Sequence, residues 1–152
     1  MIPIPSKFAL VVGRGEGTTP LNAFDAALLE AGIGNLNLLR VSSILPPGAK
    51  FSPELQIPPG TLTPTAYGYL TSSSPGQVIA AAIGVGISMD TYGVIMEFEG
   101  YCTREMAEDR VRAMVEEGFR KRNLPLKEVF VQGIDHHVEG VGAVVSAAVL
   151  GY

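Results

Sequence analysis

The 152-residue sequence predicts a single domain of the α+β class. Two segments repeat apolar residues at helical spacing, and about six others have the composition of strands. Short turns join most of these segments, and the helical patterns do not alternate regularly with the strands as they would in a doubly wound parallel sheet. No internal repeat or shift in composition divides the chain. We therefore expect two helices packed on sheets around one core.

The chain opens with an apolar run at 8–12, which predicts a strand, followed by the glycine-rich segment Gly13–Thr18. Between a strand and a helix, such a segment superficially suggests a dinucleotide-binding loop. The full fingerprint needs a third glycine where Thr18 stands and an acidic residue about twenty positions later, and both are missing. We therefore expect a tight turn into the first helix, without a nucleotide site.

Thr19, as N-cap, and Pro20, at the first helical position, predict the start of that helix. Its apolar residues recur at helical spacing, namely Leu21, Phe24, Leu28 and Ala31. At about 100° per residue, Asp25 falls within this apolar stripe. An ionisable side chain in such a place needs a cation. The residue pattern alone favours an internal salt bridge, for instance to Arg40.

The rest of the chain supplies one more helix and further strands. A strand is predicted at 35–41, and the proline-rich stretch 46–64 is expected to be an extended connection outside the sheets that packs against the domain. Thr103 caps the clearest helix, which extends to Arg122. Further strands are predicted at 66–71, 78–88, 92–98, 129–134 and 141–150.

Composition excludes several classes of protein. The net charge is −4, which lacks the basic excess of a nucleic-acid binder. The single Cys102 excludes an intrachain disulfide and a cysteine-rich zinc site. No targeting signal is visible, and the uncharged apolar stretches fall well below the ~20 residues of a membrane span. We expect a soluble, cytoplasmic protein without nucleic-acid or membrane partners.

Two pairs of side chains are candidate sites that the spacing does not favour. Glu97 and Glu99 share one face of a strand with Ile95, and their spacing alone favours a solvated strand face. His136 and His137 are adjacent on a strand and point to opposite faces, so they do not form a metal-binding pair. We expect no metal site.

The third candidate is Ser42–Ser43, at the end of a predicted strand and just before a Pro-Pro loop. Neither an esterase-like Gly-x-Ser-x-Gly nor a Ser-x-x-Lys motif surrounds it. Taken in isolation, a serine pair entering a loop is usually turn chemistry.

The segments around these candidates change that interpretation, because together they resemble the pyruvoyl-dependent arginine decarboxylases. The likeness extends from about Phe8 to the C-terminus. The segments that carry it are Thr19–Asp25, Gly32–Leu38, Arg40–Pro47, Pro64–Tyr69 and Ile95–Gly100. The segment containing Ser42–Ser43 is the most specific of them.

The resemblance implies a chain that makes its own cofactor. The Ser43 hydroxyl attacks the carbonyl of Ser42 to give an ester, and elimination leaves dehydroalanine. Hydrolysis then forms a covalent pyruvoyl group at position 43 and releases ammonia, which leaves a β chain of residues 1–42 and an α chain of residues 43–152. The processing asparagine of the family maps onto Asn37, as a donor to the developing oxyanion. Neither a metal nor pyridoxal phosphate is implied.

The resemblance also implies the mature chemistry, in which arginine forms a Schiff base with the pyruvoyl group and leaves as agmatine, a polyamine precursor, and CO2. Glu97 corresponds to the proton donor, and Glu99 could help to keep it protonated. Asp25 corresponds to the residue that holds the substrate guanidinium. The Ser42 carboxylate created by cleavage would lie beside the site.

The implied fold is a four-layer α/β/β/α sandwich. The implied assembly is a trimer of αβ units, or a dimer of trimers, with sites at the protomer boundaries. Two alternatives remain open at this point. One is the same chemistry on another basic amino acid, and the other is an unprocessed, non-catalytic trimeric scaffold.

Overall fold

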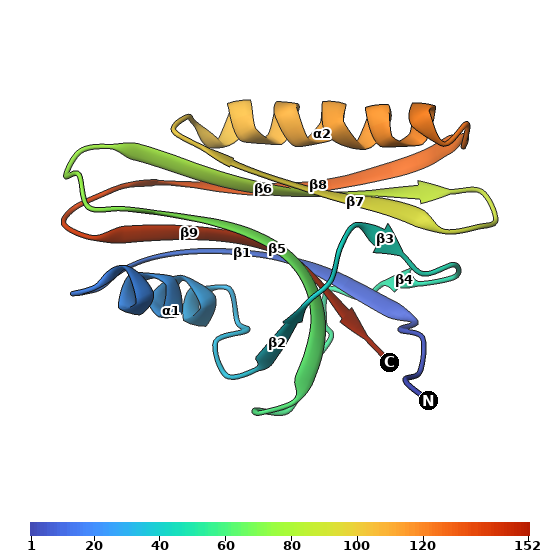
Figure 1. The fold of residues 1–152 in the computed structure, drawn as a ribbon, viewed down its shortest axis with the longest axis horizontal. Helices are drawn as coiled ribbons and strands as arrows, with labels where there is room; N and C mark the ends of the chain where they lie inside the picture. Colours follow the sequence, from blue (N-terminus) through green and yellow to red (C-terminus); the bar gives the residue numbers. More distant parts are fainter.

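Two β-sheets and two α-helices make up the fold, and the computed structural model describes all of residues 1–152 (Figure 1). The first sheet has the strand order β2 (Asn37–Arg40), β5 (Leu62–Ser72), β9 (Gly142–Gly151), β1 (Lys7–Glu16) and β4 (Lys50–Phe51). The second has the order β3 (Ile44–Leu45), β7 (Gly93–Gly100), β6 (Val78–Ser88) and β8 (Leu126–His137). The helices are α1 (Pro20–Glu30) and α2 (Arg104–Lys121). The predicted α+β class is confirmed.

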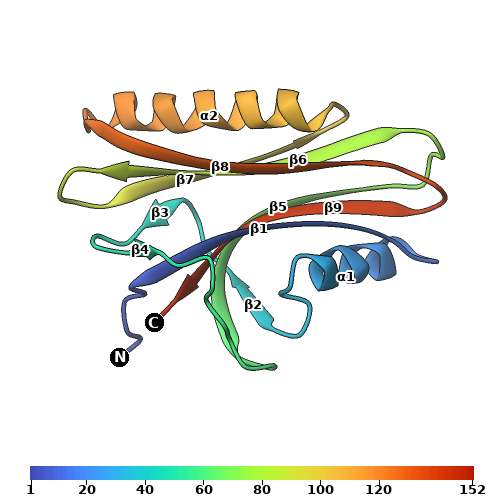
Figure 2. The ribbon, with the colours of Figure 1, turned by 180° about the vertical axis from the view of Figure 1, so that it is seen from behind.

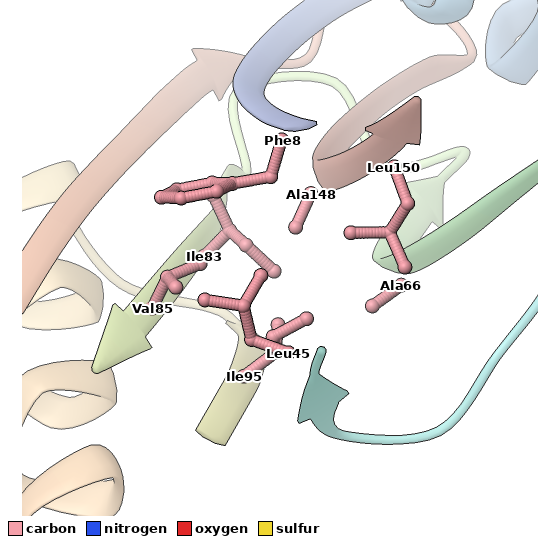
Figure 3. Close-up of a cluster of buried hydrophobic side chains, with 8 residues drawn as sticks. All are labelled: Phe8, Leu45, Ala66, Ile83, Val85, Ile95, Ala148 and Leu150. Carbon is pink, nitrogen blue, oxygen red and sulfur yellow. The ribbon is translucent and has the colours of Figure 1, made fainter. Parts of the chain in front are cut away.

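The two sheets pack face to face, and each carries one helix on its outer face (Figures 1 and 2). Helix α1 packs against β1 and β9, and α2 packs against β6, β7 and β8. A buried apolar cluster fills part of the space between the sheets (Figure 3). Its members are Phe8, Leu45, Ala66, Ile83, Val85, Ile95, Ala148 and Leu150. Neither helix is long and apolar enough to cross a membrane.

The predicted inner face of α1 is correct only in part, since Phe24, Leu28 and Ala31 pack against a buried cluster of the first sheet and Leu21 does not. Its start is as predicted, since Thr19 accepts a hydrogen bond from the Asn22 amide, but its fully buried residues are Ala23 and Ala27. Leu21 is 75% exposed. The helix lies so close to the sheet that only small side chains fit between the two backbones.

The glycines of β1 explain this close approach. A methyl group on Gly13 would lie 2.0 Å from the carbonyl oxygen of Ala27, so glycine is required there. For the same reason the predicted tight turn at Gly13–Thr18 is wrong. Strand β1 continues to Glu16 and passes directly beneath the helix.

The proline-rich stretch 46–64 was expected to lie outside the sheets. That expectation is wrong for two short parts of it, which belong to strands. Strand β4 pairs in parallel with the start of β1, and β5 already begins at Leu62. Phe51 of β4 lies 4.6 Å from Phe130 and 5.5 Å from Phe8 between ring centroids. Long-range aromatic packing of this kind leaves no local signal in the sequence.

Helix α2 is as predicted. Thr103 accepts a hydrogen bond from the Met106 amide at its start. The helical stripe Ala107, Val111, Val115 and Phe119 is buried against the second sheet. The strands that flank it were placed correctly, although β8 extends further than the predicted 129–134 at both ends.

Candidate active site

The serine pair lies where the chain crosses from one sheet to the other (Figure 1). On the near side, the Val41 amide donates to the Thr65 carbonyl of β5 over 3.1 Å. On the far side, the Ile95 amide of β7 donates to the Ser43 carbonyl over 2.7 Å. Ser42 is exposed and Ser43 is partly buried. The peptide bond between them is therefore suspended between two anchored segments that belong to different sheets.

The acidic pair on β7 lies beside this crossing, and the expected solvated strand face is wrong for Glu97, which is partly buried, while Glu99 is exposed. Glu97 is two residues beyond Ile95 on the same face, roughly 7 Å along the strand. A methyl group on Gly68 of β5 would lie 2.7 Å from Glu99 Oε2 and 3.0 Å from Glu97 Cγ. Both acids therefore point across the layer between the sheets toward β5.

This position perturbs both carboxyl groups. Burial raises the pKa of Glu97, the positive charge of Arg40 opposes that rise, and the negative charge of Glu99 adds to it. Burial also raises the pKa of Glu99, again opposed by Arg40. Neither acid belongs to any of the three ion pairs in the chain. The site thus favours a protonated carboxyl group close to the serine pair.

Arg40 is a site residue whose place was not predicted. Its Nη2 donates to the carbonyl oxygen of Tyr67 over 2.7 Å, and its guanidinium carbon lies 4.6 Å from the centroid of the Tyr67 ring. Arg40 is the last residue of β2 and pairs with Thr65 of β5, and no ion pair joins it to Asp25, so the alternative of an Arg40–Asp25 salt bridge is wrong. The available signal was its position two residues before Ser42 at a strand end.

Asp25 is exposed on α1, not enclosed in an apolar stripe. Beside it lies a hollow of about 320 Å³, lined by Pro20, Leu21, Phe24, Tyr67, Tyr69 and Thr71. Tyr67 and Tyr69 flank Gly68 on β5 and therefore point to the opposite face of the sheet from it. Within one chain, Asp25 and Glu97 are thus separated by the first sheet.

Asn37 also lies apart from the serine pair. Asn37 is the first residue of β2, at the end of the strand away from Ser42, and its side-chain Nδ2 donates to the Gly60 carbonyl over 2.9 Å. A single chain therefore brings together Ser42, Ser43 and Glu97, but neither Asp25 nor Asn37.

A second polar cluster involves His136, for which the sequence suggested no role. Glu16 Oε2 lies 2.6 Å from His136 Nε2 and accepts the Glu139 amide over 3.1 Å, and Oε1 accepts the Gly140 amide over 2.8 Å. Burial alone would raise the pKa of Glu16, but these hydrogen bonds outweigh it and lower that pKa. The cluster ties the end of β1 to the β8–β9 turn. It is a structural clamp.

Comparison with known proteins adds an independent finding. The family model described as pyruvoyl-dependent arginine decarboxylase (PvlArgDC) matches residues 7–152. A Methanocaldococcus jannaschii protein named pyruvoyl-dependent arginine decarboxylase is 49% identical over 151 residues, covering 98% of this chain and 92% of its own length. Proteins of the same name from Pyrococcus horikoshii and Methanococcus maripaludis strain C7 are 48% and 46% identical, covering 96% and 97% of this chain and 94% and 92% of their own lengths.

The match spans both sheets, both helices and every segment that carries the resemblance in sequence. It therefore includes the serine crossing and the partly buried acid beside it. This chain belongs to the pyruvoyl-dependent arginine decarboxylase family.

Proposed function

We propose that this chain decarboxylates L-arginine to agmatine and CO2, with a pyruvoyl group that it makes from its own Ser43. The observation that carries the proposal is the serine pair suspended between the sheets, with the Glu97 carboxyl roughly 7 Å along β7 from the anchor at Ile95. The names of the relatives support the cofactor and the substrate. Cleavage leaves a β chain of residues 1–42 and an α chain of residues 43–152.

The first step of the cleavage needs only the chain's own residues. Ser43 Oγ attacks the carbonyl carbon of Ser42, the bond from that carbon to the Ser43 nitrogen breaks to leave an ester, and the hydroxyl proton passes to that nitrogen. Loss of the Ser43 α-proton then expels the Ser42 carboxylate and leaves dehydroalanine, which water hydrolyses to the pyruvoyl group and ammonia. Because hydrogen bonds hold Val41 and the Ser43 carbonyl on different sheets, the intervening backbone cannot relax freely, which favours a bent conformation. The oxyanion formed during the attack needs an amide donor, and because Asn37 lies apart from Ser42 within one chain, this role for Asn37 requires a second copy of the chain or a rearrangement of its bond to Gly60.

The residues present fit the mature site. The pyruvoyl group supplies an electrophilic carbonyl for the substrate amine. It also supplies an electron sink for the bonding electrons that remain when CO2 leaves. Glu97 then delivers a proton to the former α-carbon of the substrate. Burial raises the pKa of this carboxyl group, against the charge of Arg40 and with that of Glu99, which favours the protonated form that a proton donor requires.

The substrate guanidinium binds Asp25, and the site is completed by a second copy of the chain. In support, Asp25 is exposed beside an aromatic-lined hollow that suits a planar cation, yet it lies across the first sheet from Glu97. A trimer of αβ units, or a dimer of trimers, with sites at the protomer boundaries would bring the two acids together. The exposed Leu21 and Leu29 of α1 favour such a contact.

The order α1, first sheet, second sheet, α2 supports the four-layer α/β/β/α sandwich of the family. We also propose that the enzyme acts in the cytoplasm, where the single free thiol of Cys102 stays reduced.

Intact mass and a denaturing gel of the purified protein test the proposal. Two fragments are expected, the larger with a blocked, carbonyl-reactive N-terminus, together with CO2 release from arginine. Lysine and ornithine are the comparison substrates, because a carboxylate such as Asp25 does not by itself choose among basic amino acids. Full-length protein without CO2 release would instead leave the non-catalytic scaffold as the better description.

The substrate-binding role is tested with Asp25→Asn. We expect normal cleavage and a KM for arginine raised by roughly tenfold, because a charge-assisted contact is lost. An unchanged KM would show that another group holds the guanidinium.

A further inference from the structure

The layer between the sheets continues beyond the cluster of Figure 3 as a row that is not wholly apolar. In the first sheet this row places Gly68 of β5 opposite Ser146 of β9. In the second sheet it places Glu97 of β7 opposite Ile83 of β6. The row lies two residues beyond Ile95, so it is the next layer of side chains after the serine crossing.

Ser146 is an anomaly in this row. It is fully buried, and its Oγ is the one buried side-chain polar atom in the chain without a hydrogen-bond partner. All ten residues of β9 are buried, and Ser146 is the only one with a polar side chain. An unpaired buried hydroxyl destabilises a folded protein, so its presence calls for a reason.

The neighbouring residues place Glu97 within reach of this hydroxyl. Gly68 has no side chain, and Glu97 Cγ lies 3.0 Å from the position that its Cβ would take. The Cβ positions of directly paired residues are about 5 Å apart, so Ser146 stands beside the same space. A rotation of the hydroxyl and a small shift of the flexible carboxyl, or one bridging water molecule, closes the remaining gap.

We infer that Ser146 is a positioning residue for Glu97, whose hydroxyl donates a hydrogen bond to the carboxylate that Glu97 becomes when it gives up its proton. The inference rests on the proposed function. The proton moves from Glu97 to the substrate carbon, and Ser146 keeps its own. A hydrogen bond to a carboxylate is stronger than one to the neutral acid, so the contact strengthens as charge develops.

Ser146→Ala in the processed enzyme tests the inference. We expect full cleavage, an unchanged KM and a kcat lowered roughly tenfold, which corresponds to about 1.4 kcal/mol. Loss of the donor raises the pKa of Glu97, so the basic limb of the kcat profile moves to higher pH. Ser146→Thr keeps the hydroxyl and should restore kcat.

Ser88→Ala is the matched control. Ser88 is also a buried serine, but it lies on β6 of the second sheet, and its hydroxyl donates to the carbonyls of Thr91 and Tyr92 at the β6–β7 turn. This variant should lose stability and leave the pH profile unchanged.

A measurement without turnover separates this inference from the proposed function. In the uncleaved Ser43→Ala chain, carboxyl ¹³C NMR can follow the titration of Glu97 with and without Ser146→Ala. A higher pKa in the double variant supports the contact even if the wild-type enzyme were to act on another substrate. If Ser146→Ala does not fold, Ser146→Cys, with a weaker donor, provides the same comparison.

An unchanged Glu97 titration and an unchanged kcat, with a Ser146→Ala protein that is more stable than wild type, would overturn the inference. Ser146 would then be only an unsatisfied core residue. Absence of cleavage and of CO2 release in the wild type would instead count against the proposed function.

Discussion

Glu16 and Glu97 are both partly buried acids on strands, yet their surroundings are opposite. Glu16, at the end of β1, accepts hydrogen bonds from two backbone amides of the β8–β9 turn and contacts His136. Glu97, in the middle of β7, has no ion-pair partner within its chain. The pKa of Glu16 is lowered and that of Glu97 is raised.

The difference lies in the backbone around each carboxyl group. The turn beside Glu16 leaves the amides of Glu139 and Gly140 free of any sheet, so they can bind a carboxylate. No backbone amide donates a hydrogen bond to Glu97, and the acid instead faces Gly68, the space beside Ser146 and the charges of Arg40 and Glu99. A glutamate side chain is therefore a hydrogen-bonded structural anchor at position 16. At position 97 its surroundings favour the protonated form.

The largest expected effect comes from Ser43→Ala, which removes the attacking hydroxyl. We expect one uncleaved chain and complete loss of CO2 release, while thermal stability stays close to that of the wild type because the Glu16 clamp is untouched. Intact mass and a CO2 assay measure the outcome. Two fragments in this variant would contradict the assignment of Ser43.

Glu97→Gln comes next, since it removes the proposed proton donor but keeps the shape of the side chain. We expect normal cleavage and a kcat lowered by about 100-fold, the size of a lost general acid. Glu16→Gln is the matched control, with kcat close to that of the wild type. An equal loss of kcat in both variants would contradict the claim that Glu97, and not Glu16, takes part in catalysis.

Glu16→Gln should instead affect stability. The substitution replaces a charged acceptor of two amides and His136 by a neutral one, which should lower the free energy of unfolding by about 2 kcal/mol. Urea unfolding of the uncleaved Ser43→Ala background gives this value without interference from chain separation. No change in stability would show that the clamp at the β8–β9 turn is dispensable.

The smallest effect is on the pH dependence of stability, where the two acids act with opposite signs. The lowered pKa of Glu16 provides stability above its unfolded pKa of about 4.3, which is lost as the pH falls through the folded value. The raised pKa of Glu97 provides stability below about 4.3, which is lost as the pH rises through its folded value. Melting temperatures across this range should respond oppositely to Glu16→Gln and Glu97→Gln, and a shared direction would refute one of the two pKa shifts.

Local signals in the sequence predicted the elements that depend on local contacts. The caps at Thr19 and Thr103 and the buried stripe of α2 are of this kind. The face of α1 was predicted only in part, because Gly13, on another element, decides that Ala23 and Ala27 are its most buried residues. The burial of Glu97 depends on Gly68 of the other sheet, so no pattern within β7 could have revealed it.

The candidate site came from the sequence in a different way. The family pattern pointed to Ser42 and Ser43, whereas physical reasoning on the pair alone favoured an ordinary turn. The crossing between sheets, which makes the pair unusual, is a property of the topology and has no signature in residue spacing. Arg40 and Ser146 were missed for the same reason.

The interleaving of strands from the two fragments affects how the cleaved protein refolds. Residues 1–42 contribute β1, which lies between β9 and β4, and β2, which lies beside β5, so the shorter piece is woven into a sheet built mostly from the longer one. Once the link at Ser42 is cut, assembling this sheet anew requires two molecules to meet, and its recovery after denaturation depends on concentration. The native state therefore folds from the uncleaved single chain, and it reforms slowly once it is lost in dilute solution.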